Sequence, residues 1–261
     1  MTEDADAVLR EIARYPDDVA IREVWAGLVL RRGDADRAAI VREQLARRAR
    51  QASSPYHRAH LRPAETALLE AHPEWTEELA SVGGRDASLS GGFIETIAID
   101  AATLHARPGA VLDRAPIRRL RLSGDVGLVP RLVDDGALSH VVWLDLSGLR
   151  VDAPMIESLA ALPHLRALGL ARAGITDGLV ETIWQTLPRL RVCDLDGNPC
   201  ADLVTAELTY QEMSSYEWSR TDRALALEAK HGARAWVLPS SDPASDRVDL
   251  EQLLGQISSG W

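Results

Sequence analysis

A short apolar pattern recurs through the middle of the chain. It consists of an apolar residue, two variable residues, a second apolar residue, one variable residue and a third apolar residue. The copies begin at Ile94, Ile117, Val141, Leu165 and Leu190, so successive starts lie 23, 24, 24 and 25 residues apart. A pattern that returns at a nearly constant spacing indicates a repeat architecture, in which one structural unit is copied along the chain.

The spacing within each copy predicts a short strand. The second and third apolar residues, such as Leu120 and Leu122, are two positions apart and therefore point to one face of a strand. So short a strand cannot bury its apolar face alone, but stacked copies form a parallel sheet over a continuous core. Apolar residues at helical spacing, such as Met155, Ile156 and Leu159, follow two of the copies and predict helices packed on that core.

The pattern resembles the leucine-rich repeat, L-x-x-L-x-L-x-x-N-x-L, in its bacterial form of about 24 residues. The copy LRVCDLDGNPC matches it best, with Asn198 at the asparagine position, whose side chain in that family bonds the backbone of the turn. The other copies have Ala102, Asp125, Leu149 and Ala173 there. The resemblance implies an α/β fold, a short leucine-rich-repeat solenoid of about five parallel strands with helices on the convex side.

The residues ahead of the repeats predict an all-helical N-terminal domain. Apolar stripes such as Ile21, Trp25 and Leu28 recur there at helical spacing. The segment PDDVAIREVWAGLVLRRGDADRAAIVREQ also resembles a helical companion domain that precedes leucine-rich repeats in bacteria with large genomes. The matching positions are Pro16, Asp17, Asp18, Arg22, Ala26, Arg32, Gly33, Asp34, Arg37, Ala38, Arg42 and Gln44. This second resemblance implies an architecture and no activity.

Four regions are therefore predicted. They are the helical companion domain at 1–82, a linker at 83–92, the repeats at 93–200 and a C-terminal capping region at 201–261. The linker GGRDASLSGG has the Gly and Ser content of a hinge. Within the last region, ARAWVLP could form a sixth strand or a capping strand, because a solenoid needs a cover over its last core layer.

Charge and composition narrow the range of partners. The formal net charge is −10, which makes nucleic acid an unlikely partner because its phosphates attract cations. No apolar run approaches the roughly 20 residues that span a bilayer, and the N-terminus lacks the apolar region of a secretory signal. Cys193 and Cys200 are too few for a disulfide framework and stand at apolar repeat positions, so we predict buried thiols in a cytoplasmic protein.

The sequence offers little catalytic chemistry. It contains no phosphate-binding loop, no dinucleotide-binding glycine motif and no nucleophile elbow. His57 and His60 would share a helix face, but only sequence proximity makes His72 and Glu65 candidates for further metal ligands. Solvated or interface histidines are the favoured interpretation. We therefore expect a protein that is not an enzyme and holds no cofactor and no metal.

The alternation of the strands predicts which side chains line the concave face. Trp143 stands out there, because an exposed Trp flanked by Arg is typical of an interface hot spot. The small residues Ala167, Gly169 and Ala171 beside it would leave a hollow. Two other interpretations are open, cover by the terminal segments and ordinary surface with cross-strand ion pairs. The candidate binding residues are Arg119, Arg121, Trp143, Asp145, Arg166, Arg172, Asp194 and Asp196.

The predicted function is that of a scaffold or adaptor, monomeric or weakly dimeric, that binds a protein or peptide on the concave face without catalysis. One alternative is a regulatory or substrate-recruiting subunit of a separate enzyme. A weaker alternative is nucleic-acid binding through a basic helix face. That face carries Arg37, Arg42, Arg47, Arg48 and Arg50.

Overall fold

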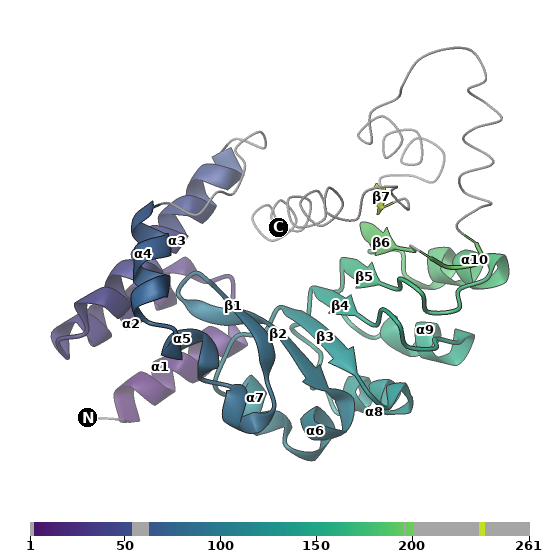
Figure 1. Cartoon of the computed structure of the whole chain (residues 1–261), viewed down its shortest axis with the longest axis horizontal. Coiled ribbons are helices and arrows are strands. Elements are labelled where there is room, and N and C mark those ends of the chain that lie inside the picture. The colour runs from purple at the N-terminus through teal and green to yellow at the C-terminus, as the bar shows by residue number, and fades with distance from the viewer. Residues whose placement is uncertain (1–2, 54–62, 196, 201–234, 238–261) are drawn as a thin grey trace, which may run out of the picture. The chain divides into compact units, whose positions relative to one another are not determined.

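The computed structural model describes residues 3–53, 63–195, 197–200 and 235–237 (Figure 1). The chain belongs to the α/β class, with a mostly parallel sheet whose strands follow one another in chain order. It divides into two compact units, and the boundary falls between Arg121 and Leu122. Each unit is described by itself. Among the described helices, none is long and apolar enough to cross a bilayer.

The first unit opens with the predicted helical region. Its elements are α1 (Glu3–Arg14), α2 (Val19–Arg31), α3 (Ala35–Ser53), α4 (Pro63–Ala71), α5 (Glu74–Glu77) and the 3-10 turn η1 (Ala80–Val82). Asp18 caps α2 by accepting the backbone N–H groups of Ala20 and Ile21 at 2.8 and 3.2 Å. Ile12 and Trp25 lie in the core that α1, α2 and α3 share.

A β-hairpin follows where the sequence analysis expected a linker. Strand β1 (Arg85–Ser90) pairs antiparallel with β2 (Phe93–Asp100). Gly91 and Gly92 have φ values of 58° and 83°, the left-handed conformation that a two-residue hairpin turn requires. A Cβ on Gly91 would strike the Arg22 side chain, and one on Gly92 would strike Val41. The linker prediction for 83–92 was therefore wrong for most of that segment, because the glycine pair forms a tight turn packed against α2 and α3.

The first unit continues to the third strand. Helix α6 (Ala101–Ala106) begins at Asp100, whose carboxylate accepts the N–H groups of Ala102 and Thr103 at 3.0 and 3.1 Å. Helix α7 (Pro108–Leu112) comes next, and β3 (Arg119–Ser123) crosses the boundary between the units.

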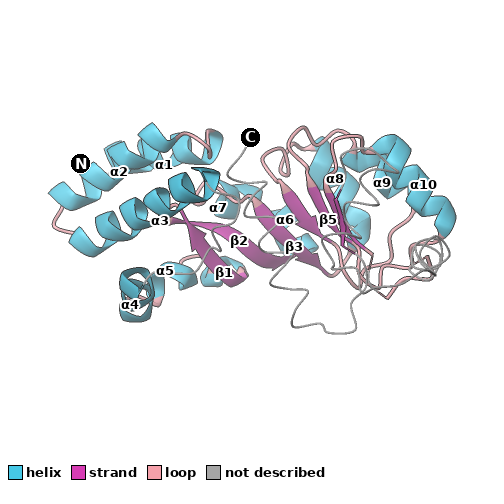
Figure 2. Ribbon diagram, turned by 90° about the horizontal axis from the view of Figure 1, so that it is seen from above, coloured by secondary structure: helices cyan, strands magenta, loops and turns pink. Residues whose placement is uncertain are grey.

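The second unit repeats a strand and a helix. It contains η2 (Val126–Leu128), α8 (Val129–Asp134), β4 (Trp143–Asp145), α9 (Ala153–Leu159), β5 (Ala167–Gly169), α10 (Asp177–Thr186), β6 (Val192–Asp194) and β7 (Ala235–Val237). Strands β4, β5, β6 and β7 pair parallel, each with the next. The helices α8, α9 and α10 lie along one side of the strands (Figure 2).

The apolar positions of the pattern form the core of the second unit. Leu144, Leu168 and Cys193 stand opposite one another on β4, β5 and β6, and each is at most 1% exposed. Strand β7 confirms a strand within ARAWVLP. The rest of the predicted capping region, 201–234 and 238–261, lies outside the described residues.

Asn198 is a buried polar residue in this apolar stack. Its Oδ1 accepts the N–H groups of Ala173 and Ile175 at 2.9 and 3.0 Å. Its Nδ2 donates to the carbonyls of Leu170 and Leu195 at 2.7 and 2.9 Å. The side chain thus bonds the backbone of its own turn and of the preceding copy, as the resemblance to the repeat family implied.

Candidate functional site

Parallel pairing in register aligns the predicted site residues of the second unit in two rows. Trp143 stands opposite Ala167, which in turn stands opposite Val192. The next row along the strands holds Asp145, Gly169 and Asp194. Neighbouring strands lie about 4.8 Å apart, so the members of a row are next to one another on one face. The structure therefore brings Trp143, Asp145 and Asp194 together.

This face is less open than the alternation predicted. Trp143 and Asp194 are half-buried, while Asp145 is only 8% exposed. Ala167 and Ala171 are buried as well, so the expected hollow of small residues beside Trp143 is wrong. Strand alternation predicts the side of the sheet to which a side chain points. Its exposure also depends on which residues pack against that side, and the apolar pattern of a short strand carries no information about them.

The Asp145 carboxylate occupies a defined position between β4 and β5. Its Oδ1 accepts the N–H of Ser147 at 2.9 Å, which turns the carboxylate back over the strand end. A Cβ added to Gly169 would lie 2.6 Å from that oxygen. Gly169 therefore leaves the room that Asp145 occupies. In this turn Asp145 has a structural role, which the prediction of an outward contact residue missed.

The remaining predicted residues of the second unit are dispersed. Arg166 is half-buried, and its Nη1 donates to the carbonyls of Pro163 and Leu165 at 3.1 and 2.9 Å, within the loop before β5. Arg172 is exposed and has a φ of 52°. Asp196 lies outside the described residues.

Arg119 and Arg121 belong to the first unit. Both lie on β3, where Arg119 is half-buried and Arg121 is exposed. Trp143 and Asp145 belong to the other compact unit, so the two arginines are described here by themselves.

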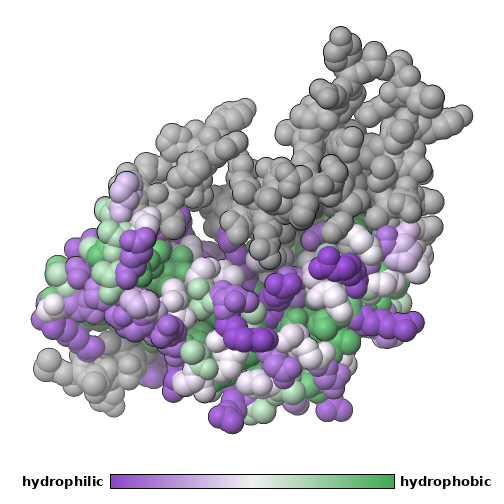
Figure 3. Space-filling view, viewed as in Figure 1, coloured by the Kyte–Doolittle hydropathy of each residue, from purple (hydrophilic) through white to green (hydrophobic). Residues whose placement is uncertain are grey.

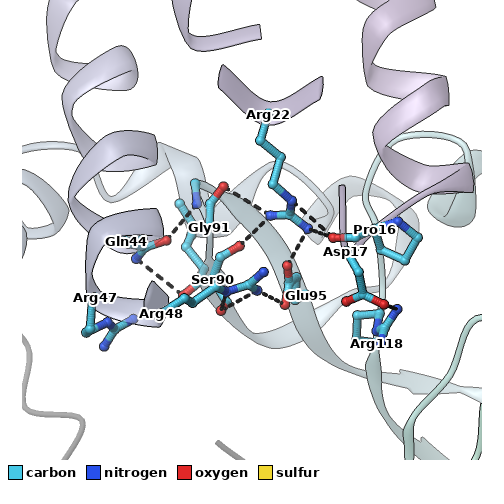
Figure 4. A network of polar contacts seen from close by, with 12 residues as sticks. Pro16, Asp17, Arg22, Gln44, Arg47, Arg48, Ser90, Gly91, Glu95 and Arg118 are labelled. Atoms are coloured by element: carbon cyan, nitrogen blue, oxygen red, sulfur yellow. Dashed lines mark hydrogen bonds and ion pairs between the residues drawn. The ribbon is translucent and has the colours of Figure 1, made fainter. Parts of the chain in front are cut away.

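The first unit contains a buried polar network that the sequence analysis did not predict (Figure 4). At its centre is Arg22, which is 0% exposed. Its guanidinium donates twice to the Pro16 carbonyl, at 3.1 and 2.6 Å, and at 3.1 Å to each of the carbonyls of Ser90 and Gly91. Its Nη2 also donates to Glu95 Oε1 at 2.6 Å. All three guanidinium nitrogens are engaged, which offsets much of the cost of burying the cation.

Glu95 links two arginines from different helices. Its second oxygen accepts from Arg48 on α3, which also donates to the Ser90 hydroxyl at 3.2 and 2.7 Å. Burial alone would raise the pKa of Glu95, but Arg48 and Arg22 outweigh burial and lower that pKa below its ordinary value. The carboxylate therefore stays charged, and the network fixes α2 and α3 to the hairpin.

A second buried group extends this network along α3. Gln44 donates to Glu65 at 2.8 Å and accepts the N–H of Gly92 at 2.7 Å. Glu65 is fully buried and pairs with Arg47 at 3.1 Å. Gln44 and Arg47 of α3 thus both contact Glu65 of α4, and Gln44 also contacts the hairpin.

These contacts bear on the basic helix face that was a weaker candidate for nucleic-acid binding. Arg37 is 6% exposed and pairs with Glu78 at 3.0 Å, while Arg47 and Arg48 pair as described above. Arg42 is half exposed and lies 3.6 Å from Glu23. Since these cations already have carboxylate partners, the arginines of α3 give no support to the nucleic-acid alternative. The side chain of Arg50 is outside the described residues.

An alternating column of rings and cations crosses the same unit. Phe93 packs edge-on against Trp25, with ring centroids 4.7 Å apart. The Arg37 guanidinium lies 5.7 Å from the Trp25 ring and 4.9 Å from the Trp75 ring. His72 stacks on Trp75, 4.2 Å between centroids at an interplanar angle of 7°. Cation–π contact with two indoles helps to hold the buried Arg37 charge, whose pKa burial lowers.

Sequence signals for the network did exist. Arg22 interrupts the apolar stripe of α2, and Glu95 stands within FIETIAID, in which five of the eight residues are apolar. A charged residue in a buried element needs an opposite charge beside it, so Arg22 and Glu95 are candidates to pair with each other. The sequence could not show that these positions, 73 residues apart, meet. The alternation of the first copy, beginning at Ile94, predicts Glu95 on the open face of its strand, whereas it is 5% exposed.

The described residues offer no metal centre. Among them, no group of three His, Cys, Asp or Glu side chains is arranged to hold an ion. His57 and His60 lie outside the described residues. Cys193 and Cys200 are free thiols, each 1% exposed, and burial raises the pKa of Cys193 well above its ordinary value. The prediction of buried cysteines that act as small apolar side chains is confirmed.

Apolar and hydrophilic residues are interspersed over the described surface that Figure 3 shows. The large apolar side chains that are exposed include Tyr15, Val19, Val24 and Leu30. They come from the first unit and not from the predicted site. Comparison of the chain with protein-family models, with curated proteins and with solved structures found no match.

Proposed function

We propose that the chain is a cytoplasmic leucine-rich-repeat protein that binds a protein or peptide partner without catalysing a reaction. The binding surface is the strand face of the second unit, around Trp143. The supporting observation is the in-register row of Trp143, Ala167 and Val192 on β4, β5 and β6. The row places the half-buried ring of Trp143 beside the buried side chains of Ala167 and Val192, so the ring is the part of the row that a partner can reach.

Trp143 is the anchor of this surface. It is half-buried, so its ring retains area that a partner can cover while its position is fixed by the neighbouring strands. Tryptophan is enriched among the residues that dominate binding energy, because it buries a large area with few rotatable bonds. The acidic residue Asp194 at the next row supplies a polar rim.

Trp143→Ala tests the proposal against a matched control. We expect this variant to lose partner binding by about 2 kcal/mol or more, which is roughly a thirtyfold loss of affinity. Glu157→Ala changes an exposed residue of α9, on the helical side of the unit, and should bind as the wild type does. Affinity purification from lysate of the source organism followed by titration of the purified partner provides the measurement.

Circular dichroism and thermal unfolding must show that both variants fold. If folded Trp143→Ala captures and binds the same partner as tightly as Glu157→Ala does, the assigned surface is wrong. If the partner that depends on Trp143 is an enzyme whose turnover changes on binding, the chain acts as its regulatory subunit. A partner that is not an enzyme supports the scaffold role.

A further inference from the structure

His72 lies at a junction of three helices in the first unit. It follows α4, its ring stacks on Trp75 of α5, and both ring nitrogens face carboxylates. Nδ1 lies 2.8 Å from Glu74 Oε1, at the start of α5. Nε2 lies 3.1 Å from Asp36 Oδ2, in the first turn of α3. One imidazole thus bridges two helices that are distant in sequence.

The two contacts of the His72 ring determine how many protons the ring must carry to satisfy both. An ionised carboxylate only accepts hydrogen bonds, and a neutral imidazole carries a single N–H. A neutral His72 could therefore donate to Glu74 or to Asp36, but not to both. Only the doubly protonated imidazolium satisfies both contacts. The two nitrogens also point in different directions, so Asp36, His72 and Glu74 cannot share one metal ion.

We propose that His72 is a proton-operated clasp, which holds α5 to the start of α3 when the ring is charged and releases one of its two contacts when the ring is neutral. The clasp lies over the outer end of the aromatic column, because His72 covers one side of the Trp75 ring while Arg37 packs within 4.9 Å of that ring.

The charges around the ring favour the protonated form. Hydrogen bonds to Glu74 and then to Asp36 raise the pKa of His72 above its ordinary value of about 6.5. The cation Arg37 packs on the Trp75 ring, and Glu78 pairs with it at 3.0 Å. Because the folded-state pKa is raised, the stabilisation is fully present below the unfolded value and is lost as the pH rises through the folded value.

Nuclear magnetic resonance of the ¹⁵N-labelled full chain tests the clasp directly. The His72 signals are assigned by their loss in His72→Gln, and the other histidines are internal controls. We expect both ring nitrogens of His72 to be protonated on the acid side, with a titration midpoint above that of an unperturbed histidine. Glu74→Gln and Asp36→Asn should each shift the midpoint downward, and the double variant should shift it further.

A stability measurement separates the clasp from plain packing. His72→Gln keeps a polar side chain of similar length but carries no charge. It should unfold at lower urea concentration than the wild type at about pH 5.5, with a smaller difference at about pH 8.5. An equal deficit at both pH values would show that the ring only packs. An unshifted midpoint in the double carboxylate variant would overturn the proposal.

Discussion

The two units bury their interiors by different means. In the second unit the core is a stack of equivalent apolar residues, such as Leu144, Leu168 and Cys193, and each layer resembles the one before it. In the first unit the junction of helices and hairpin holds the charged residues Arg22 and Glu95, both nearly inaccessible to solvent. A stack of similar layers gains stability by repetition.

The buried ions at the junction of helices and hairpin affect the stability of the first unit in a different way. Replacing a buried ion pair by apolar residues is often neutral for stability, whereas removing one partner is costly. The triad of Arg22, Glu95 and Arg48 therefore specifies one docking of α2 and α3 on the hairpin, since any other docking leaves a charge unpaired. The first unit is thus sensitive to single charge changes, and the second to changes of volume and backbone bonding.

Glu95→Gln should give the largest effect. The change keeps the size of the side chain but leaves Arg22 as a buried cation without its counter-charge, at a cost of about 3–5 kcal/mol. Urea unfolding of the full chain measures this loss, and hydrogen exchange should place it in the first unit. Glu23→Gln is the control, because Glu23 pairs with Arg42 at the surface and its loss should cost less than about 1 kcal/mol.

The same carboxylate gives the effect a pH dependence. Because the folded-state pKa of Glu95 is lowered, its contribution is present above the unfolded value and is lost as the pH falls through the folded value. The deficit of Glu95→Gln against the wild type should therefore shrink on acidification. Equal unfolding midpoints of Glu95→Gln and Glu23→Gln at neutral pH would contradict the ionic account of the junction.

Asn198→Ala should give the next largest effect, this time in the second unit. The side chain makes four hydrogen bonds to buried backbone, including the N–H groups of Ala173 and Ile175. Their loss removes the Asn198 acceptor of the Ile175 N–H and leaves the Ala173 N–H with the Leu170 carbonyl at 3.2 Å, and we expect about 2–3 kcal/mol of destabilisation. Hydrogen exchange should show faster exchange at these two amides than in the wild type. Unchanged exchange at both amides would mean that the asparagine is dispensable for the turn.

The sequence predicted the second unit better than the first, for a physical reason. A period of about 24 residues predicts every layer at once, so the strand positions at Leu144, Leu168 and Cys193 followed from spacing alone. The junction in the first unit occurs once. Its partners Arg22 and Glu95 belong to an α-helix and a strand, and no periodicity connects them. Composition also favoured a linker where Gly91 and Gly92 make a hairpin turn.

The sequence predicted the candidate binding face better than the ionic junction of the first unit, but less completely than the strand positions of the second. The alternation predicted that Trp143 and Asp194 share one strand face, and the parallel register puts them in neighbouring rows, because strands with a constant repeat stay in register. It did not predict the exposure of Asp145, which depends on the local turn to Ser147 and on the absence of a side chain at Gly169. Single substitutions of that pair distinguish a structural role from a binding role.

Gly169→Ala should give the smallest of these effects and the sharpest test of that role. The new Cβ would lie 2.6 Å from Asp145 Oδ1, so the carboxylate must move from its seat. We expect overpacking to cost about 1–3 kcal/mol, measured by urea unfolding. In an Asp145→Ala background the same substitution should cost much less, because the obstructing oxygen is gone. The difference between the two costs is the coupling energy of the pair. If Gly169→Ala is equally destabilising in both backgrounds, Asp145 does not occupy that space, and its carboxylate would be available to a partner beside Trp143.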